Sequence, residues 1–244
     1  NALWYYLAEG RNTRQPSGMV RASMEIVVGD EAVMLRRSVQ DTGKRGISVG
    51  YPGGVNITFD AENLGLNQIW WGRFIDARPV WTGQGNGQAH PLDRQRTQLA
   101  NGPAFVVVGT EQPWPTPTRR ERGDRFLGYE LDAEQRPMFR YTSGKITIED
   151  KPEQTVVDGK TVLRRTVMLS GDPTVLHFLA ARHKTIERID DHTTQIGKHL
   201  RIRTNDHPIA IVPAGEEKEL RVMIKMKSNP TKLVIEYSWA QEDK

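Results

Sequence analysis

The chain has 244 residues, with 34 Lys and Arg against 30 Asp and Glu, a formal charge of +4 and 37% apolar residues. Its 6 Trp, 6 Tyr and 6 Phe are spread along the sequence, so the composition excludes a disordered protein. No apolar run approaches the roughly 18 residues of a membrane-spanning helix, so we expect no direct membrane span. The absence of cysteine excludes disulfides, thiolate metal sites and a CxxCH haem attachment within these residues.

Residues 1–18 are predicted to form a short helix and a linker. Apolar residues recur at helical spacing within residues 2–9, and Gly10 follows, as is typical after a helix. Residues 11–18 are polar and contain a proline and a glycine, a composition typical of linkers. A lone helix before a linker indicates the tail of a preceding domain, and Asn1, which is neither an initiator Met nor the start of a signal peptide, agrees with this expectation.

Residues 19–244 are predicted to form one β domain. Short runs of β-branched and aromatic residues alternate with Gly, Pro, Asn and Asp, and no βαβ alternation indicates a Rossmann or TIM arrangement. The predicted fold is all-β, a large elaborated antiparallel β-sandwich with a short N-terminal helix. Two smaller sandwiches, divided near residues 149–159, are the alternative. The expected strands are 25–28, 32–38, 46–49, 55–60, 68–74, 104–108, 125–131, 137–141, 145–149, 161–170, 175–179, 185–189, 199–204, 209–212, 219–226 and 233–238.

Two long segments without strand character, residues 77–102 and 109–123, are the predicted location of a site, because long loops in compact domains are often functional. Each contains a tryptophan. Aromatic faces beside charged side chains suit a sugar, whose C–H face stacks on an indole while its hydroxyls form hydrogen bonds. Packing is the competing interpretation, because consecutive tryptophans on a strand point to opposite faces. The candidate ligand-binding residues are Trp71, Arg73, Asp76, Trp81, His90 and Trp114.

The sequence gives weaker indications of metal binding, glycan hydrolysis and nucleic-acid binding. No HExxH motif occurs, and His177 and His183, six residues apart in an extended segment, would lie near 20 Å apart, so no metal site is expected. Paired acids can hydrolyse glycosides, and Asp76 with an acid from residues 124–132 is the candidate pair. The basic residues are scattered among acids, which favours solvated surfaces and no nucleic-acid partner.

Several motifs occur in order along the chain: GISVGYPGGVNITFD (46–60), IWWGRFID (69–76) with WTG (81–83), FLGYELD (126–132), RPMF (136–139) and LRRT (163–166). Together they resemble a β-rich module of large bacterial c-type cytochrome proteins. The resemblance covers residues 19–239 and implies a periplasmic or secreted location and a redox context. It also implies haem c on a neighbouring domain or subunit, with no cofactor in this fragment. The helix expected in residues 2–9 resembles the last helix of a cytochrome c domain, which implies that the preceding domain is cytochrome c-like.

Three functions are consistent with these observations. The leading hypothesis is a non-catalytic accessory module of an exported c-type cytochrome protein, which binds carbohydrate or another small polar ligand near Trp81, His90 and Trp114. The first alternative is a structural scaffold that docks a haem domain or redox subunit in an electron-transfer complex. The second alternative is a glycan-acting enzyme that uses Asp76 in acid–base catalysis.

Overall fold

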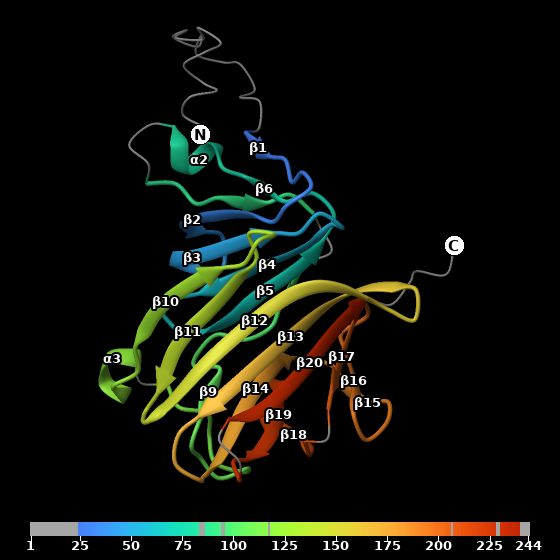
Figure 1. Cartoon of the computed structure of the whole chain (residues 1–244). Coiled ribbons are helices and arrows are strands. Elements are labelled where there is room, and N and C mark those ends of the chain that lie inside the picture. Colours follow the sequence, from blue (N-terminus) through green and yellow to red (C-terminus); the bar gives the residue numbers. More distant parts are fainter. Residues whose placement is uncertain are drawn as a thin grey trace, which may run out of the picture.

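The computed structural model describes residues 24–82, 86–93, 96–116, 118–205, 207–227 and 230–239, and the predicted helix and linker of residues 1–18 lie outside this part. The described chain is mostly β-strand and forms four antiparallel sheets (Figure 1). Its two helices have four residues each, α2 (Arg78–Trp81) and α3 (Arg119–Arg122). The prediction of an all-β, sandwich-like fold is confirmed.

An eight-stranded sheet forms one layer of the sandwich. Its longer strands alternate between buried and partly exposed residues, because one face packs on the core and the other faces solvent. The β12–β13 hairpin turns at Asp158 and Gly159, both with positive φ, as the Asp-Gly pair predicts. The strand order is β10 (Phe126–Leu131), β11 (Pro137–Ser143), β12 (Ile146–Val157), β13 (Lys160–Ser170), β20 (Thr231–Trp239), β17 (Leu200–Thr204), β16 (Thr193–Ile196) and β15 (Ile186–Arg188).

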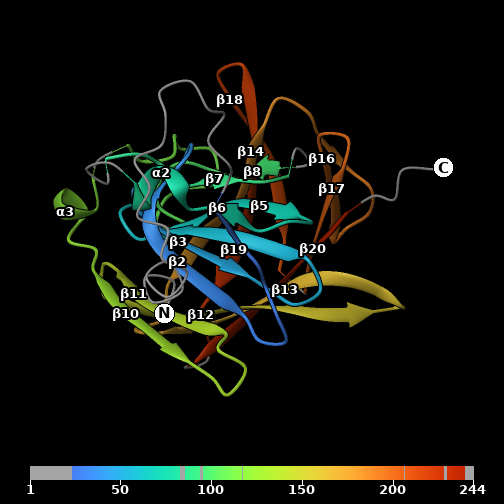
Figure 2. The same ribbon diagram turned by 90° about the horizontal axis from the view of Figure 1, so that it is seen from above.

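The opposing layer consists of a five-stranded and a four-stranded sheet (Figures 1 and 2). Backbone hydrogen bonds from Arg182 to Leu99 and from Leu179 to Ala104 join the segment between β8 and β9 to the four-stranded sheet. The five-stranded order is β2 (Val33–Val39), β3 (Gly43–Gly50), β4 (Val55–Asp60), β5 (Gly65–Trp71) and β8 (Arg96–Gln98). The four-stranded order is β18 (Ile209–Ala214), β19 (Glu217–Lys225), β14 (Val175–His183) and β9 (Phe105–Val106).

The main core lies between these two layers. One cluster of buried apolar residues draws on all three large sheets, and it extends along the sequence from Ala32 to Tyr237. Phe59 of β4 stacks on Phe139 of β11, with ring centroids 4.2 Å apart. Phe105 of β9 packs on Phe178 of β14, at 4.9 Å. Burial of this apolar surface is the main favourable contribution to folding.

A smaller layer covers the outer face of the five-stranded sheet. It contains α2 and a three-stranded sheet of β1 (Glu25–Ile26), β6 (Ile75–Asp76) and β7 (His90–Pro91), and we call it the cover layer. Trp70 is fully buried in the cluster beneath this cover, while its neighbour Trp71 packs against the main core. The two side chains therefore point to opposite faces of β5, as the strand period predicts.

Three features differ from the strand boundaries expected from the sequence. The segment 77–102 contains α2, β7 and β8, because very short elements carry little periodic signal. Residues 149–157 continue β12 and pair with β13. The alternative boundary between two smaller sandwiches, near residues 149–159, therefore falls within a β-hairpin. The strand β16 also lies where none was expected. Within the described residues, no helix is both long and apolar enough to cross a membrane.

Candidate functional site

The cover layer brings together three of the six candidate residues. Asp76 on β6 lies directly opposite His90 on β7, and Trp81 ends α2 shortly after. His90 is exposed, and Trp81 is 39% exposed. These residues offer a polar surface with one accessible indole, and none of them lines the cavities described below.

Arg73 and Asp76 both have structural partners in this layer. Arg73 forms an exposed ion pair with Glu25 of β1. The Oδ1 atom of Asp76 accepts hydrogen bonds from the backbone N–H of Met24 at 2.7 Å and of Arg78 at 3.0 Å. Asp76 therefore holds the start of α2 and the chain before β1 in place, which explains its position without a ligand.

Trp71 and Trp114 lie apart from this surface. Trp71 packs against Trp239, with ring centroids 5.6 Å apart. Trp114 is only 6% exposed; its Nε1–H donates to the carbonyl of Pro103 at 2.9 Å, and the Arg221 guanidinium lies 5.2 Å from its ring. Trp114 has both its polar atom and a ring face engaged within the protein.

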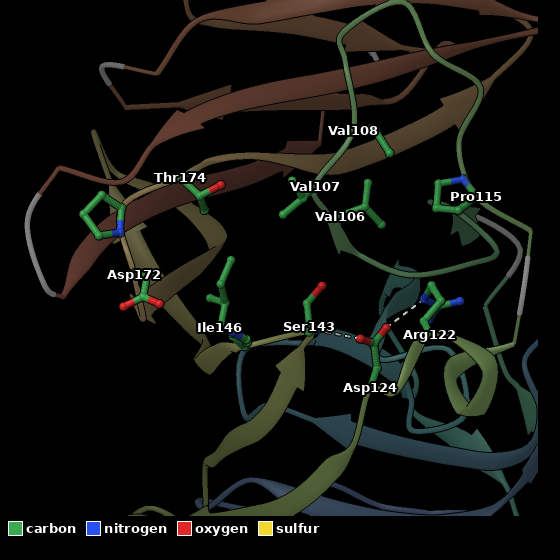
Figure 3. A pocket seen from close by; sticks show the side chains of 13 residues that line it. Val106, Val107, Val108, Pro115, Arg122, Asp124, Ser143, Ile146, Asp172 and Thr174 are labelled. Atoms are coloured by element: carbon green, nitrogen blue, oxygen red, sulfur yellow. Dashed lines mark hydrogen bonds and ion pairs between the residues drawn. The ribbon is translucent and has the colours of Figure 1, made fainter.

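Two acids considered as the partner of Asp76 in glycan hydrolysis, Asp124 and Asp132, are held in ion pairs. Asp124 is buried and accepts hydrogen bonds from Arg122 Nε at 2.7 Å and the Gly144 N–H at 2.8 Å (Figure 3). Burial acts to raise the pKa of Asp132, but hydrogen bonds from Arg136 and Lys151 outweigh it and lower this pKa to about 2. These contacts give both acids structural roles. No group of three or more metal-ligating side chains occurs among the described residues.

A strongly charged groove of about 540 Å³ lies at one edge of the sandwich, where β2 lies beside β10. We call it the basic groove. Two contacts show that these edges meet: the Ala32 N–H donates to the Glu134 carbonyl at 3.1 Å, and the Arg36 guanidinium lies 5.5 Å from the Tyr129 ring centroid. The lining residues are Arg36, Arg37, Lys44, Arg45, Gly46, Ile47, Ala61, Arg119 and Phe126.

The β2–β3 hairpin supplies four of its five cations. Antiparallel pairing places Arg36 opposite Ile47 and Arg37 opposite Gly46, so two basic residues on each strand come close together. Because β2 is an edge strand, side chains from both of its faces can border the groove. All four basic side chains belong to exposed residues.

The fifth cation, Arg119, comes from α3. Thr118 and Glu121 form a capping box at the start of this helix, and Gly123 ends it in the left-handed conformation, with φ of 77°. Hydrogen bonds from the Thr118 backbone and side chain lower the pKa of Glu121 and keep its carboxylate ionised. The short helix is thus fixed at both ends and holds Arg119 at the groove.

One carboxylate offsets part of this charge. Glu62 pairs with Arg45 Nε at 3.0 Å and with Arg119 Nε at 3.5 Å. It lies on the β4–β5 turn, which is held by buried Asp60 through a 2.8 Å hydrogen bond from the Glu62 N–H. The Lys44 ammonium has no hydrogen-bond or ion-pair partner within the described parts of the chain. The five cations and the Glu62 carboxylate give the groove a net charge of +4, which equals the formal charge of the whole chain.

This arrangement suits an anionic ligand. Four of the five cations are Arg, whose planar guanidinium can donate two parallel hydrogen bonds to a carboxylate, sulfate or phosphate. A cavity of this volume is within the range that holds small ligands. The finding differs from the scattered basic residues expected from the sequence. The signal that could have found it is the pair of basic doublets, Arg36-Arg37 and Lys44-Arg45, on the two strands of one hairpin.

Further cavities are found among the described residues. One, of about 530 Å³, lies beside β9, and we call it the apolar cavity; its apolar walls come from Val106, Val107, Val108, Pro115, Ile146 and Pro173 (Figure 3). Another, of about 440 Å³, is polar and lies between β8 and the β16–β17 turn. A third, of about 310 Å³, is lined by residues of β17 and β20 together with His192 and Asn205. No protein-family model matches the chain, and no curated protein matches it.

Proposed function

We propose that the chain is a non-catalytic accessory module that binds an anionic ligand in the basic groove. The observation that carries this proposal is the gathering of five cations around one cavity with a single carboxylate between them. The net charge of the groove, +4, equals the formal charge of the whole chain, so the groove is a local excess of positive charge that would attract an anion. The groove offers charged donors but no paired acid and base, which favours binding over catalysis.

The wider setting in this proposal is an exported c-type cytochrome protein. It rests on the sequence motifs of residues 19–239 alone, and it would place the module in the periplasm or outside the cell, beside a domain or subunit with haem c. The module itself would hold no cofactor. In that setting, the basic groove would keep the haem protein near an anionic substrate or surface.

Titration with dextran sulfate, with uncharged dextran as reference, tests the binding proposal. We expect dextran sulfate to bind at low salt and to dissociate as salt is added, because ions screen exposed charges. The double variant Arg37→Ala/Lys44→Ala should bind about tenfold more weakly, since it removes two charged contacts of about 0.7 kcal/mol each.

The matched control is Arg201→Ala/Lys160→Ala, which removes the same two residue types from exposed positions on β17 and β13, outside the groove. It should bind dextran sulfate as the unmodified chain does. An equal loss in both double variants would show that affinity follows overall charge and would refute the groove as the site.

The scaffold function is a second candidate, favoured by the apolar cavity. Val107 is 61% exposed and lines it, so the apolar surface of the cavity continues onto the outside of the protein. In this case, a c-type cytochrome domain would cover Val106–Val108 and Pro115. Hydrogen exchange of the full-length cytochrome protein should then show slower exchange at residues 106–108 than in this chain alone, and unchanged exchange would argue against docking there.

A further inference from the structure

The basic groove has an apolar floor beneath its charged rim. Ile47 and Ala61 are buried at its base, and Phe126 lines it from β10. Phe126 also packs on Phe59 of the main core, with ring centroids 5.9 Å apart, so its ring is held in place. A small inorganic anion would leave this floor unused. A ligand with both negative groups and apolar C–H faces would contact the rim and the floor together.

The five cations lie on two walls. The β2–β3 hairpin contributes four of them, and α3 contributes Arg119 from a different part of the chain. The Glu62 carboxylate reaches one cation on each wall, Arg45 and Arg119, and a single small ion would likewise contact only the donors that surround one point. A ligand whose negative charges are spaced along a chain could contact both walls at once, and the position of the groove at a sheet edge leaves room for the chain to continue.

Nucleic acids also combine anionic groups with flat rings, but the groove suits them less well. Single-stranded nucleic acids bind on successive aromatic platforms, one for each stacked base. Among the described lining residues, Phe126 is the single aromatic one. The nearby Tyr129 already has the Arg36 guanidinium over its ring. Sugar rings need fewer such platforms, because their hydroxyls and acidic groups form most of their contacts.

We propose that the ligand of the basic groove is an acidic polysaccharide, with uronate carboxylates or sulfate esters spaced along a chain of sugar rings. This inference rests on the proposed function and names its ligand class. Arg37, Lys44 and Arg119 bind the negative groups, and Phe126 contacts the C–H face of a sugar ring. Carboxylate and sulfate share the geometry that arginine recognises, so the probes must separate them.

Calorimetric titration of the whole chain with five probes tests this inference. The probes are an oligogalacturonate, a sulfated oligosaccharide, an uncharged oligosaccharide of equal length, inorganic polyphosphate and oligodeoxythymidylate. We expect one or both acidic oligosaccharides to bind at least about tenfold more tightly than polyphosphate and oligodeoxythymidylate, and the uncharged one not to bind.

Variants at the floor and at the rim separate the two kinds of contact. Phe126→Leu keeps an apolar side chain against Phe59. It should weaken the binding of acidic oligosaccharides several-fold and leave the binding of polyphosphate unchanged. Arg119→Ala should weaken the binding of every anionic probe. The control Leu127→Ala alters the next residue of β10, which is 52% exposed, and should not change the affinity for any probe.

The outcomes distinguish this inference from the proposed function. If all anionic probes bind equally and Phe126→Leu has no effect, the groove is a general anion site, and the polysaccharide inference is wrong. Tightest binding of oligodeoxythymidylate would also overturn it, in favour of nucleic acid. If no anionic probe binds at low salt, both the inference and the proposed function are wrong.

Discussion

At the scale of single residues, the most unusual feature of the core is a buried ion pair. Arg165 Nε donates to Asp150 Oδ1 at 2.7 Å, and both side chains are almost fully buried. Burial and the neighbouring Asp150 carboxylate raise the pKa of Tyr141 well above its ordinary value, so its hydroxyl stays protonated and donates to Asp150 at 3.1 Å. The carboxylate thus balances a charge that would be costly alone in the core.

Asp150→Asn should therefore destabilise the fold by about 3–5 kcal/mol, because it leaves the Arg165 guanidinium buried without a countercharge. The double variant Asp150→Leu/Arg165→Met should lose much less free energy of unfolding, since it removes both charges together. Urea denaturation of the three proteins measures both effects. A double variant as unstable as the single one would show that packing, rather than charge, dominates at this position.

The lowered pKa of Asp132 predicts that the stability of the fold depends on pH. Its pKa is about 2 in the folded protein, below the ordinary value of 3.8, because hydrogen bonds from Arg136 and Lys151 favour the ionised form. A lowered carboxyl pKa stabilises the fold above pH 3.8, and this contribution disappears as the pH falls towards 2. The gap in unfolding free energy between the wild type and Asp132→Asn should narrow over that interval in acid denaturation experiments. A gap that stays constant with pH would contradict this assignment.

At the scale of elements, the β2–β3 hairpin depends on a close approach at Gly46. A Cβ atom there would lie 2.7 Å from Val39 Cγ2 and 3.1 Å from the Arg37 carbonyl oxygen. Gly46→Ala should cost about 1–3 kcal/mol in urea denaturation, because the hairpin must shift to admit the methyl group. Gly29→Ala is the control: no atom lies within 4 Å of its Cβ position, and stability should change by less than about 1 kcal/mol. Equal effects would refute the packing argument.

The sequence indicated most long strands, because their alternation is strong. Residues 55–60 form β4 with the expected bounds, and Arg164 and Arg165 show the strand period directly: one pairs with Glu236 near the surface, and the other is buried. The continuation of β12 was missed because Pro152 argues against a strand, although the structure pairs it with Arg165. The two-residue strands β6 and β7 are too short for any periodicity to show.

At the scale of the whole molecule, the main core is shared by both layers. Its residues come from the five-, four- and eight-stranded sheets and extend from Ala32 to Tyr237. We therefore expect one cooperative unfolding transition. Tryptophan fluorescence and far-ultraviolet circular dichroism should give coincident curves in urea, and two separated midpoints would indicate independently stable parts.

The basic doublets of the β2–β3 hairpin are visible in the sequence, but the contribution of Arg119 to the basic groove could not be derived from it. Arg119 reaches the β2–β3 hairpin only because the edges of two facing sheets meet there, and no local pattern encodes which edges meet. The sequence suggested that Trp81 and Trp114 belong to one ligand site, because both lie in long segments without strand character. The structure places one in the cover layer and the other under Arg221.

The contact above Trp114 has a consequence for the order of folding. Arg221 of β19 donates to the carbonyl of Gln112 at 2.7 Å and is itself held by buried Glu219, so a loop is fixed by residues more than one hundred positions later in the chain. Contacts of such long sequence separation have a high loop-closure cost and form after local hairpins. During synthesis, we therefore expect Trp114 to be buried under Arg221 only after β19 has been made.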